Sequence, residues 1–277
     1  MRHLQLKARM AIVGSLLFVF YAVAATVAYA MFGGGPTVLA LVLVGSVLFV
    51  GVQYKVGKWA ALRSVGAEEL TRGDYPHIHD RVEALSRDMG IEKPELKIAR
   101  MGVPNAFAVG RKGAGTVVVS EELIAALEPD ELEGVLAHEL AHIANRDVVM
   151  MVLGQGIASI VAIVAQWAVL LTGDNDIADF FLAIVVGQLV QLLVMVFVLA
   201  ISRYREYVAD ADARRAIGGG EPLASALEKI SRGNERARDS AVDEQVNALC
   251  IFGQGSGLAK LFSTHPPVEK RIERLRA

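Results

Sequence analysis

The chain has 277 residues, of which 53% are hydrophobic and 21% charged, and its formal net charge is −2. This near-neutral balance provides no field that would attract nucleic acid, so no nucleic-acid partner is expected. The apolar content is higher than that of an ordinary soluble domain, which disfavours a purely soluble enzyme. The single cysteine, Cys250, excludes an intramolecular disulfide framework and a CxxC metal site. Any metal chemistry must therefore use histidines and carboxylates.

The apolar residues form blocks that are long enough to cross a membrane. Residues 10–54 carry no charge and are interrupted by Gly33-Gly34-Gly35-Pro36. Residues 148–173 and 180–202 are also uncharged, and a short acidic loop separates them. A transmembrane helix needs about 20 apolar residues. The sequence therefore predicts four transmembrane helices in two hairpins, and the glutamines of the second pair indicate packing inside protein.

The positive charges predict how these helices are oriented. All 28 Lys and Arg residues lie within 1–9, 55–147 or 203–277, and neither short loop contains one. By the positive-inside rule, both termini and residues 55–147 face the cytoplasm of a multi-pass cell-membrane protein. A cleaved signal peptide ending near Ala28-Tyr29-Ala30 is the alternative for the start. The run from Met10 to Phe32 is longer than the roughly 7–15 residues of a signal core, which favours a retained anchor.

The same distribution predicts four segments. Residues 1–57 form an N-terminal transmembrane hairpin, 58–147 a first cytosolic part, 148–202 a second transmembrane hairpin and 203–277 a second cytosolic part. The two cytosolic parts must meet in space to make one cytosolic domain. We expect an α-rich membrane protein with a cytosolic α+β domain.

Local patterns predict the elements of the first cytosolic part. Residues 76–89 have apolar positions at helical spacing. Three short, partly alternating runs punctuated by glycines follow and predict a small antiparallel sheet: 95–99, 104–109 and 116–120. Ser120, followed by two glutamates, is typical of a helix N-cap, and Pro129 is typical of the first position of a second helix.

This second helix carries His138-Glu139-Leu140-Ala141-His142. Histidines four positions apart project from one helix face, so both imidazoles can reach one Zn²⁺. Glu139 lies beside them, where it can act as a base on water. The motif predicts one zinc ion per chain.

A third ligand is expected from the helix that follows the last apolar block. Glu206 and Asp210 are again four residues apart, so one carboxylate can ligate zinc while the other orients a ligand imidazole. The alternative is a solvated helix face on which Arg203, Arg205, Glu206 and Asp210 form surface pairs. His142 and Glu206 each lie a few residues from an apolar block. The second hairpin would therefore bring them to the same membrane face.

These features together resemble one known family. The motif His138–His142 with Glu206 and Asp210, the strand Asn105-Ala106-Phe107-Ala108, and the tail 263–271 are similar to the HtpX family of membrane zinc metalloproteases, relatives of the CAAX prenyl proteases. The resemblance implies a zincin-like (gluzincin) protease domain. By motif position it implies His138, His142 and Glu206 as zinc ligands and Glu139 as the catalytic glutamate. It also implies membrane-protein quality control and a role in the stress response, with misfolded or damaged membrane proteins as substrates.

Two further assignments concern the substrate. His265, between Thr264 and two prolines, could donate a hydrogen bond to the oxyanion of the tetrahedral intermediate; the alternative is a polar turn residue. The strand Asn105-Ala106-Phe107-Ala108 could pair with an extended substrate backbone, which would allow cleavage with little sequence preference. The alternative for the strand is plain sheet structure.

Other functions remain open at this stage. A CAAX-type processing protease would cleave prenylated tails. A non-catalytic membrane scaffold would use structural zinc, although such a site normally has four protein ligands. Intramembrane proteolysis is disfavoured, because His138 and Glu139 lie in a charged segment and no span contains an aspartate.

Overall fold

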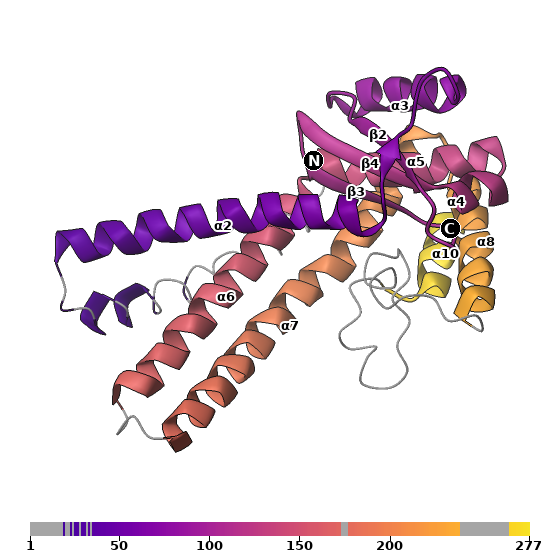
Figure 1. Ribbon diagram of the computed structural model, residues 1–277. Coiled ribbons are helices and arrows are strands. Elements are labelled where there is room, and N and C mark those ends of the chain that lie inside the picture. The colour runs from indigo at the N-terminus through magenta and orange to yellow at the C-terminus, as the bar shows by residue number, and fades with distance from the viewer. Residues whose placement is uncertain are drawn as a thin grey trace. The chain divides into compact units, whose positions relative to one another are not determined.

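Figure 1 presents the computed structural model, which describes residues 35–172, 177–238 and 266–277 and isolated positions between 19 and 33. The chain divides into two compact units. The first, here called the apolar unit, comprises Met1–Val56 and Met150–Ile201. The second, here called the polar unit, comprises Gly57–Val149 and Ser202–Ala277. Each unit is described by itself.

The apolar unit is made of long helices. They belong to α2 (Pro36–Ser64), α6 (Asp147–Thr172) and α7 (Ile177–Ala216). Within the described residues, two stretches are long and apolar enough to cross a membrane, namely Asp147–Thr172 and Ile177–Val196. The prediction of four spans is thus not confirmed. The first predicted helix, up to Phe32, lies largely outside the described residues.

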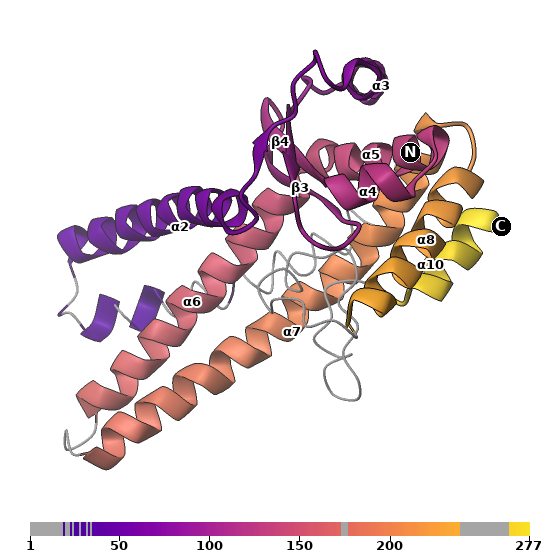
Figure 2. The same ribbon diagram turned by 45° about the vertical axis from the view of Figure 1, so that its right-hand side comes forward.

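The helices of the apolar unit pack through small residues and glutamines. A Cβ added to Gly187 of α7 would overlap the side chain of Gln166 on α6, and one added to Gly156 would meet Val50 of α2 at 2.7 Å. Figures 1 and 2 both show α6 and α7 side by side. Large apolar side chains such as Val47, Leu189 and Val196 remain exposed. Lipid is the environment in which such exposure costs least, because hydrocarbon replaces water around these side chains.

The polar unit contains a four-stranded sheet in the order β1-β2-β4-β3. Its strands are β1 (Glu68–Glu69), β2 (Glu95–Ala99), β3 (Ala106–Arg111) and β4 (Ala114–Ser120). β3 and β4 form an antiparallel hairpin, whereas β2 pairs with β4 in parallel. The prediction of an antiparallel sheet is therefore wrong for this pair, and the sheet is mixed.

The connection between β2 and β3 explains the difference. This segment carries the chain past β4, so that β3 starts on the far side of β4 and becomes an edge strand. Two hydrogen bonds fix the crossing: the backbone N–H of Asn105 donates to Oγ of Ser120 at 2.9 Å, and that of Ser120 donates to the carbonyl of Asn105 at 2.9 Å. Ser120 Oγ also accepts from the N–H of Leu123, which confirms its predicted role as the cap of α4 (Glu121–Ala126).

Helices cover one face of this sheet. They are arranged in layers: α5 (Pro129–Ala144) packs on the sheet, α3 (Pro76–Met89) and α8 (Glu221–Arg238) pack on α5, and α10 (Val268–Arg276) packs on α8. The main core contains Val117 and Val119 of β4 together with apolar residues of these helices, while Val118 belongs to a smaller cluster. This alternation follows from the two-residue period of a strand and shows that β4 is buried on both faces. α5 therefore lies within the core, against the sheet.

Candidate active site

The helix α5 is fixed by its N-terminal cap and by its close packing against α8. Glu128 and Glu131 form a capping box at its start, with Pro129 in the first turn. A Cβ on Gly134 would meet backbone atoms of Leu223 at 3.0 Å, so the glycine permits the close approach of α8. His138 and His142 follow on this helix, one turn apart, as the spacing predicts.

The carboxylates on α7 are buried. Arg205, Glu206 and Asp210 are each only 4% exposed. The alternative of a solvated helix face is therefore wrong for these three residues. A buried charge needs a partner of opposite charge or a metal ion, so this arrangement calls for specific contacts.

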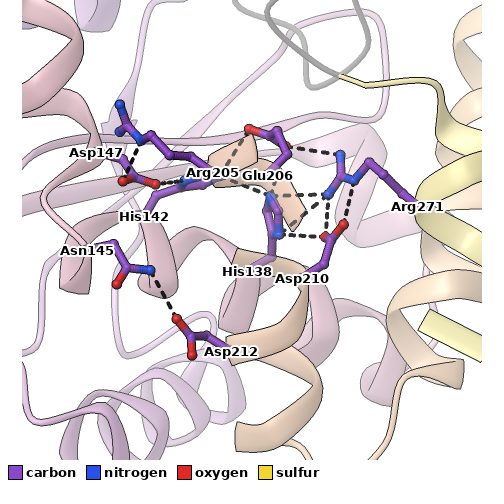
Figure 3. Close-up of polar contacts among 9 residues, drawn as sticks. All are labelled: His138, His142, Asn145, Asp147, Arg205, Glu206, Asp210, Asp212 and Arg271. Atoms are coloured by element: carbon purple, nitrogen blue, oxygen red, sulfur yellow. Dashed lines mark hydrogen bonds and ion pairs between the residues drawn. The ribbon is translucent and has the colours of Figure 1, made fainter. Parts of the chain in front are cut away.

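His138, His142 and Glu206 each offer one ligand atom, and these atoms lie within 4.8 Å of one another (Figure 3). The two Nε2 atoms are 3.1 Å apart, and they lie 3.5 and 3.4 Å from the carboxylate oxygens of Glu206. A tetrahedral site with bonds of ~2.0–2.1 Å has ligand atoms about 3.3 Å apart. The observed spacing and the nitrogen and oxygen donors therefore fit a zinc-sized cation.

The other nitrogen of His138 faces α7 and α10. Its Nδ1 lies 3.0 Å from Oδ1 of Asp210. Arg271, which is fully buried, donates to both oxygens of Asp210 at 2.9 and 2.7 Å. Nη1 of Arg271 also lies 3.2 Å from Oε2 of Glu206. A residue of the last helix thus connects the two carboxylates of α7.

The other nitrogen of His142 faces the start of α6. Its Nδ1 lies 2.6 Å from Oδ2 of Asp147, and Nε of Arg205 lies 2.6 Å from Oδ1 of the same aspartate. Figure 3 shows Asp147 and Asp210 on opposite sides of the histidine pair. The sequence analysis did not identify Asp147, because a residue five positions after His142 does not share its helix face. Only the turn after α5 brings the carboxylate back to the ring.

The same contacts set the charges of the site. Burial and the charge of Arg271 lower the pKa of His138, but hydrogen bonds to Asp210 and Glu206 outweigh them and raise it to about 9. Burial lowers the pKa of His142 to about 4. Burial raises the pKa of Asp210, but the charge of Arg271 and hydrogen bonds to Arg271 and His138 lower it to about 2. Asp210 is therefore ionised, and the site stabilises positive charge beside Glu206.

The remaining predicted residues differ in where they lie. Glu139 is on α5, 3% exposed, and its carboxylate is close enough to act electrostatically on His142. Asn105, Ala106 and Phe107 are buried, and Ala108 is partly buried. Three of the four belong to β3, the edge strand. His265 lies outside the described residues, which resume at Pro266.

A helix that presents two histidines to a carboxylate of a second helix, with a glutamate beside the first histidine, defines a metallopeptidase of the HExxH type. Residues 74–277 match Peptidase family M48. The chain belongs to this family, and it is a metalloprotease of the HtpX type.

Relatives over nearly the full length agree. A protein named Protease HtpX homolog from Halobacterium salinarum is 67% identical and covers 97% of this chain and 100% of the relative. Proteins of the same name from Salinibacter ruber and Pyrococcus abyssi are 35% and 37% identical; they cover 94% and 95% of this chain and 95% and 93% of the relatives. These names agree with the resemblance inferred from the motifs.

The crystal structure of S. mikatae Ste24p has a similar fold, with a TM-score of 0.59 and 19% identity. The match covers 97% of this chain and 63% of that chain, so this chain spans less than two thirds of the length of Ste24p. The likeness supports the arrangement of helices and sheet.

Proposed function

We propose that the protein is a membrane-anchored zinc-dependent endopeptidase that hydrolyses peptide bonds of misfolded or damaged membrane proteins at the cytosolic face. The observation that carries this proposal is the cluster of His138, His142 and Glu206 beside Glu139. Its three ligands leave a fourth position open, which is typical of catalytic zinc sites. Membership of family M48 supports proteolysis, and two apolar helices support an attachment to the membrane.

In this proposal His138, His142 and Glu206 hold one zinc ion. The chemistry that zinc supplies when bound is polarisation of the scissile carbonyl and increased acidity of water. Glu139 takes a proton from the attacking water and passes it to the leaving amine. Asp210 accepts from Nδ1–H of His138 and so holds that ring in the tautomer whose Nε2 faces the other ligands.

The edge position of β3 supports the proposed substrate pairing. Within the described residues, β3 pairs with one strand, β4, so its other edge can accept an extended peptide. Backbone hydrogen bonds from 105–108 would hold the substrate with little regard to its side chains. The buried side chains of Ala106 and Phe107 fix the strand in place and do not obstruct such pairing.

His265 is proposed as a donor to the oxyanion. It immediately precedes Pro266 and lies three residues before α10, the helix that delivers Arg271 to the site. A donor on this segment would act where negative charge develops on the substrate.

The protein is proposed to have both termini and residues 55–147 in the cytoplasm. The basis is the distribution of its Lys and Arg residues. Reporters fused after residue 57, between 90 and 130 and at the carboxyl end should all report a cytoplasmic location. An external signal from the segment that contains His138 would contradict the proposed orientation.

The proposed activity is tested with unfolded casein. The zinc-loaded protein in detergent should cleave it, a chelator should stop cleavage, and added zinc should restore it. Glu139→Gln is the matched inactive control, because it keeps the size of the side chain but cannot accept the proton. A folded, zinc-loaded wild type with no activity on casein would favour a scaffold with structural zinc, and cleavage confined to a prenylated peptide would favour the CAAX-type alternative.

A further inference from the structure

We propose that Asp147 is a positioning residue for the metal site, which orients the ring of His142, and that Arg205 in turn holds Asp147. This inference rests on the proposed function, because it takes His142 to be a zinc ligand. It concerns the side of the site that faces the start of α6 and adds two residues that the motif does not contain.

The contacts of Asp147 define the arrangement. Its two oxygens are divided between two partners: Oδ2 lies 2.6 Å from Nδ1 of His142, and Oδ1 lies 2.6 Å from Nε of Arg205. The side chains of Asp147 and Arg205 are almost completely buried, at 5% and 4% exposure. An ionised carboxylate only accepts hydrogen bonds, so Nδ1 of His142 carries the proton. Its Nε2 lone pair is then directed toward His138 and Glu206.

The backbone just before Asp147 supports this role. Arg146 has φ = 59°, a left-handed conformation, and it is the one non-glycine residue with positive φ in the part of the chain that the structure describes. Such a conformation costs free energy for a residue with a Cβ. It lies between the C-cap of α5 and the start of α6, and so separates the two helices. Strain of this kind persists where surrounding contacts require it, and here the contact is the return of Asp147 to His142.

A second contact holds the same turn. Nδ2 of Asn145 donates to Oδ2 of Asp212 on α7 at 3.1 Å. This contact does not touch a histidine (Figure 3). Asp212 therefore offers a comparison: this aspartate of α7 contacts the turn through Asn145, whereas Asp147 contacts the ring of His142.

The structure argues against a purely stabilising ion pair. Burying a charged pair has a large desolvation cost, and such pairs are often no more stabilising than apolar residues of the same size. The pair of Asp147 and Arg205 also corresponds to that of Asp210 and Arg271 behind His138, although Arg271 donates two hydrogen bonds to Asp210 and Arg205 makes a single ionic contact with Asp147. Both histidines thus have an aspartate at Nδ1 and an arginine behind it, the outer contacts that fix ligand geometry in zinc sites.

The test compares the zinc affinity of full-length variants in detergent, by competition with a chromophoric chelator. Asp147→Asn should weaken zinc binding by about 10- to 100-fold, the usual effect of removing such an outer contact. Asp212→Asn should bind zinc as tightly as the wild type. In addition, the visible spectrum of the Co²⁺-substituted Asp147→Asn protein should shift, because the orientation of a ligand ring changes. An equal loss of affinity in both variants would assign the effect to the turn and overturn the proposal.

A second variant guards against loss of folding. Asp147→Asn leaves the charge of Arg205 buried, so the double variant Asp147→Asn/Arg205→Met removes both charges together. Its metal-free form should melt near the wild-type temperature, yet it should still bind zinc about 10- to 100-fold more weakly. Wild-type zinc affinity in this folded double variant would overturn the proposal.

The proposed function is tested separately by His142→Ala. If this variant keeps full zinc affinity, His142 is not a ligand and the proposed metal site fails. If His142→Ala loses zinc while Asp147→Asn does not, the metal site stands and only the positioning role of Asp147 is wrong.

Discussion

His138 and His142 lie one turn apart on α5, and each directs Nδ1 toward an aspartate that is paired with an arginine. The two sides of the site, one at each histidine, differ in how deeply the histidine is buried. The side chain of His138 is 3% exposed and that of His142 is 15% exposed. Behind His138, Arg271 pairs with both Asp210 and Glu206.

The two sides of the site depend on different parts of the fold. The His138 side depends on α10, a helix of nine residues at the end of the chain, because Arg271 reaches Asp210 across 61 positions of sequence. The contact of Asp147 with His142 depends on the turn between α5 and α6, which is local to the motif, and only Arg205 behind it comes from a distant helix. Damage to the tail should therefore affect Glu206 and His138 first, and damage to the turn should affect His142 alone.

The largest effect on activity is expected at Glu139, which contacts neither Asp147 nor Asp210 in the arrangement described above. Glu139→Gln should lower kcat on casein by about 10³-fold or more, because the side chain can no longer move the proton. Zinc content, measured by elemental analysis, should stay at the wild-type value. Turnover near that of the wild type would rule out Glu139 as the base.

Glu206→Ala removes the carboxylate that lies beside Nε2 of both histidines and that we propose as the third zinc ligand. Zinc content after dialysis should fall well below one ion per chain, since three ligands become two and Arg271 loses one of its partners. Asp210→Asn is the comparison, because it changes the neighbouring carboxylate and leaves the ligand count intact. Full occupancy in Glu206→Ala would remove Glu206 from the ligand set.

His265→Ala tests whether the segment before α10 also supplies the oxyanion donor. If it does, kcat and kcat/KM should fall together by roughly 10²–10³, because the lost hydrogen bond forms mainly in the transition state. Steady-state kinetics with zinc measured in the same sample separates this from metal loss. A kcat within a few-fold of wild type, with a lower melting temperature, would make His265 a structural residue of the turn.

The smallest expected effect is the difference between the two arginines. Arg271→Met should lower the free energy of unfolding by about 3–5 kcal/mol, because buried carboxylates lose their partner. Arg205→Met should cost less, by about 1–3 kcal/mol, since Arg271 holds Glu206 as well as Asp210. Melting temperatures of the metal-free variants in one detergent compare them. Equal melting temperatures would contradict the inference that Arg271, with two carboxylate partners, contributes more to stability than Arg205.

Part of the fold follows directly from local sequence. The predicted helix at 76–89, the cap at Ser120 and the helix start at Pro129 are confirmed. Each depends on interactions within a few residues: helical periodicity, a hydroxyl that accepts a backbone N–H, and a proline without one. The sheet order was not predictable in this way, because the pairing of β2 with β4 depends on the path of the intervening chain.

The sequence by itself determined that two histidines and a glutamate share one helix and that carboxylates four residues apart follow on another, because helical spacing decides this locally. Only the tertiary structure decided which groups stand behind the histidines. Asp147 reaches His142 through a left-handed turn at Arg146, and Arg271 reaches Asp210 from the last helix. Such contacts depend on how distant segments pack and on the cost of burying unpaired charge, which no window of sequence contains.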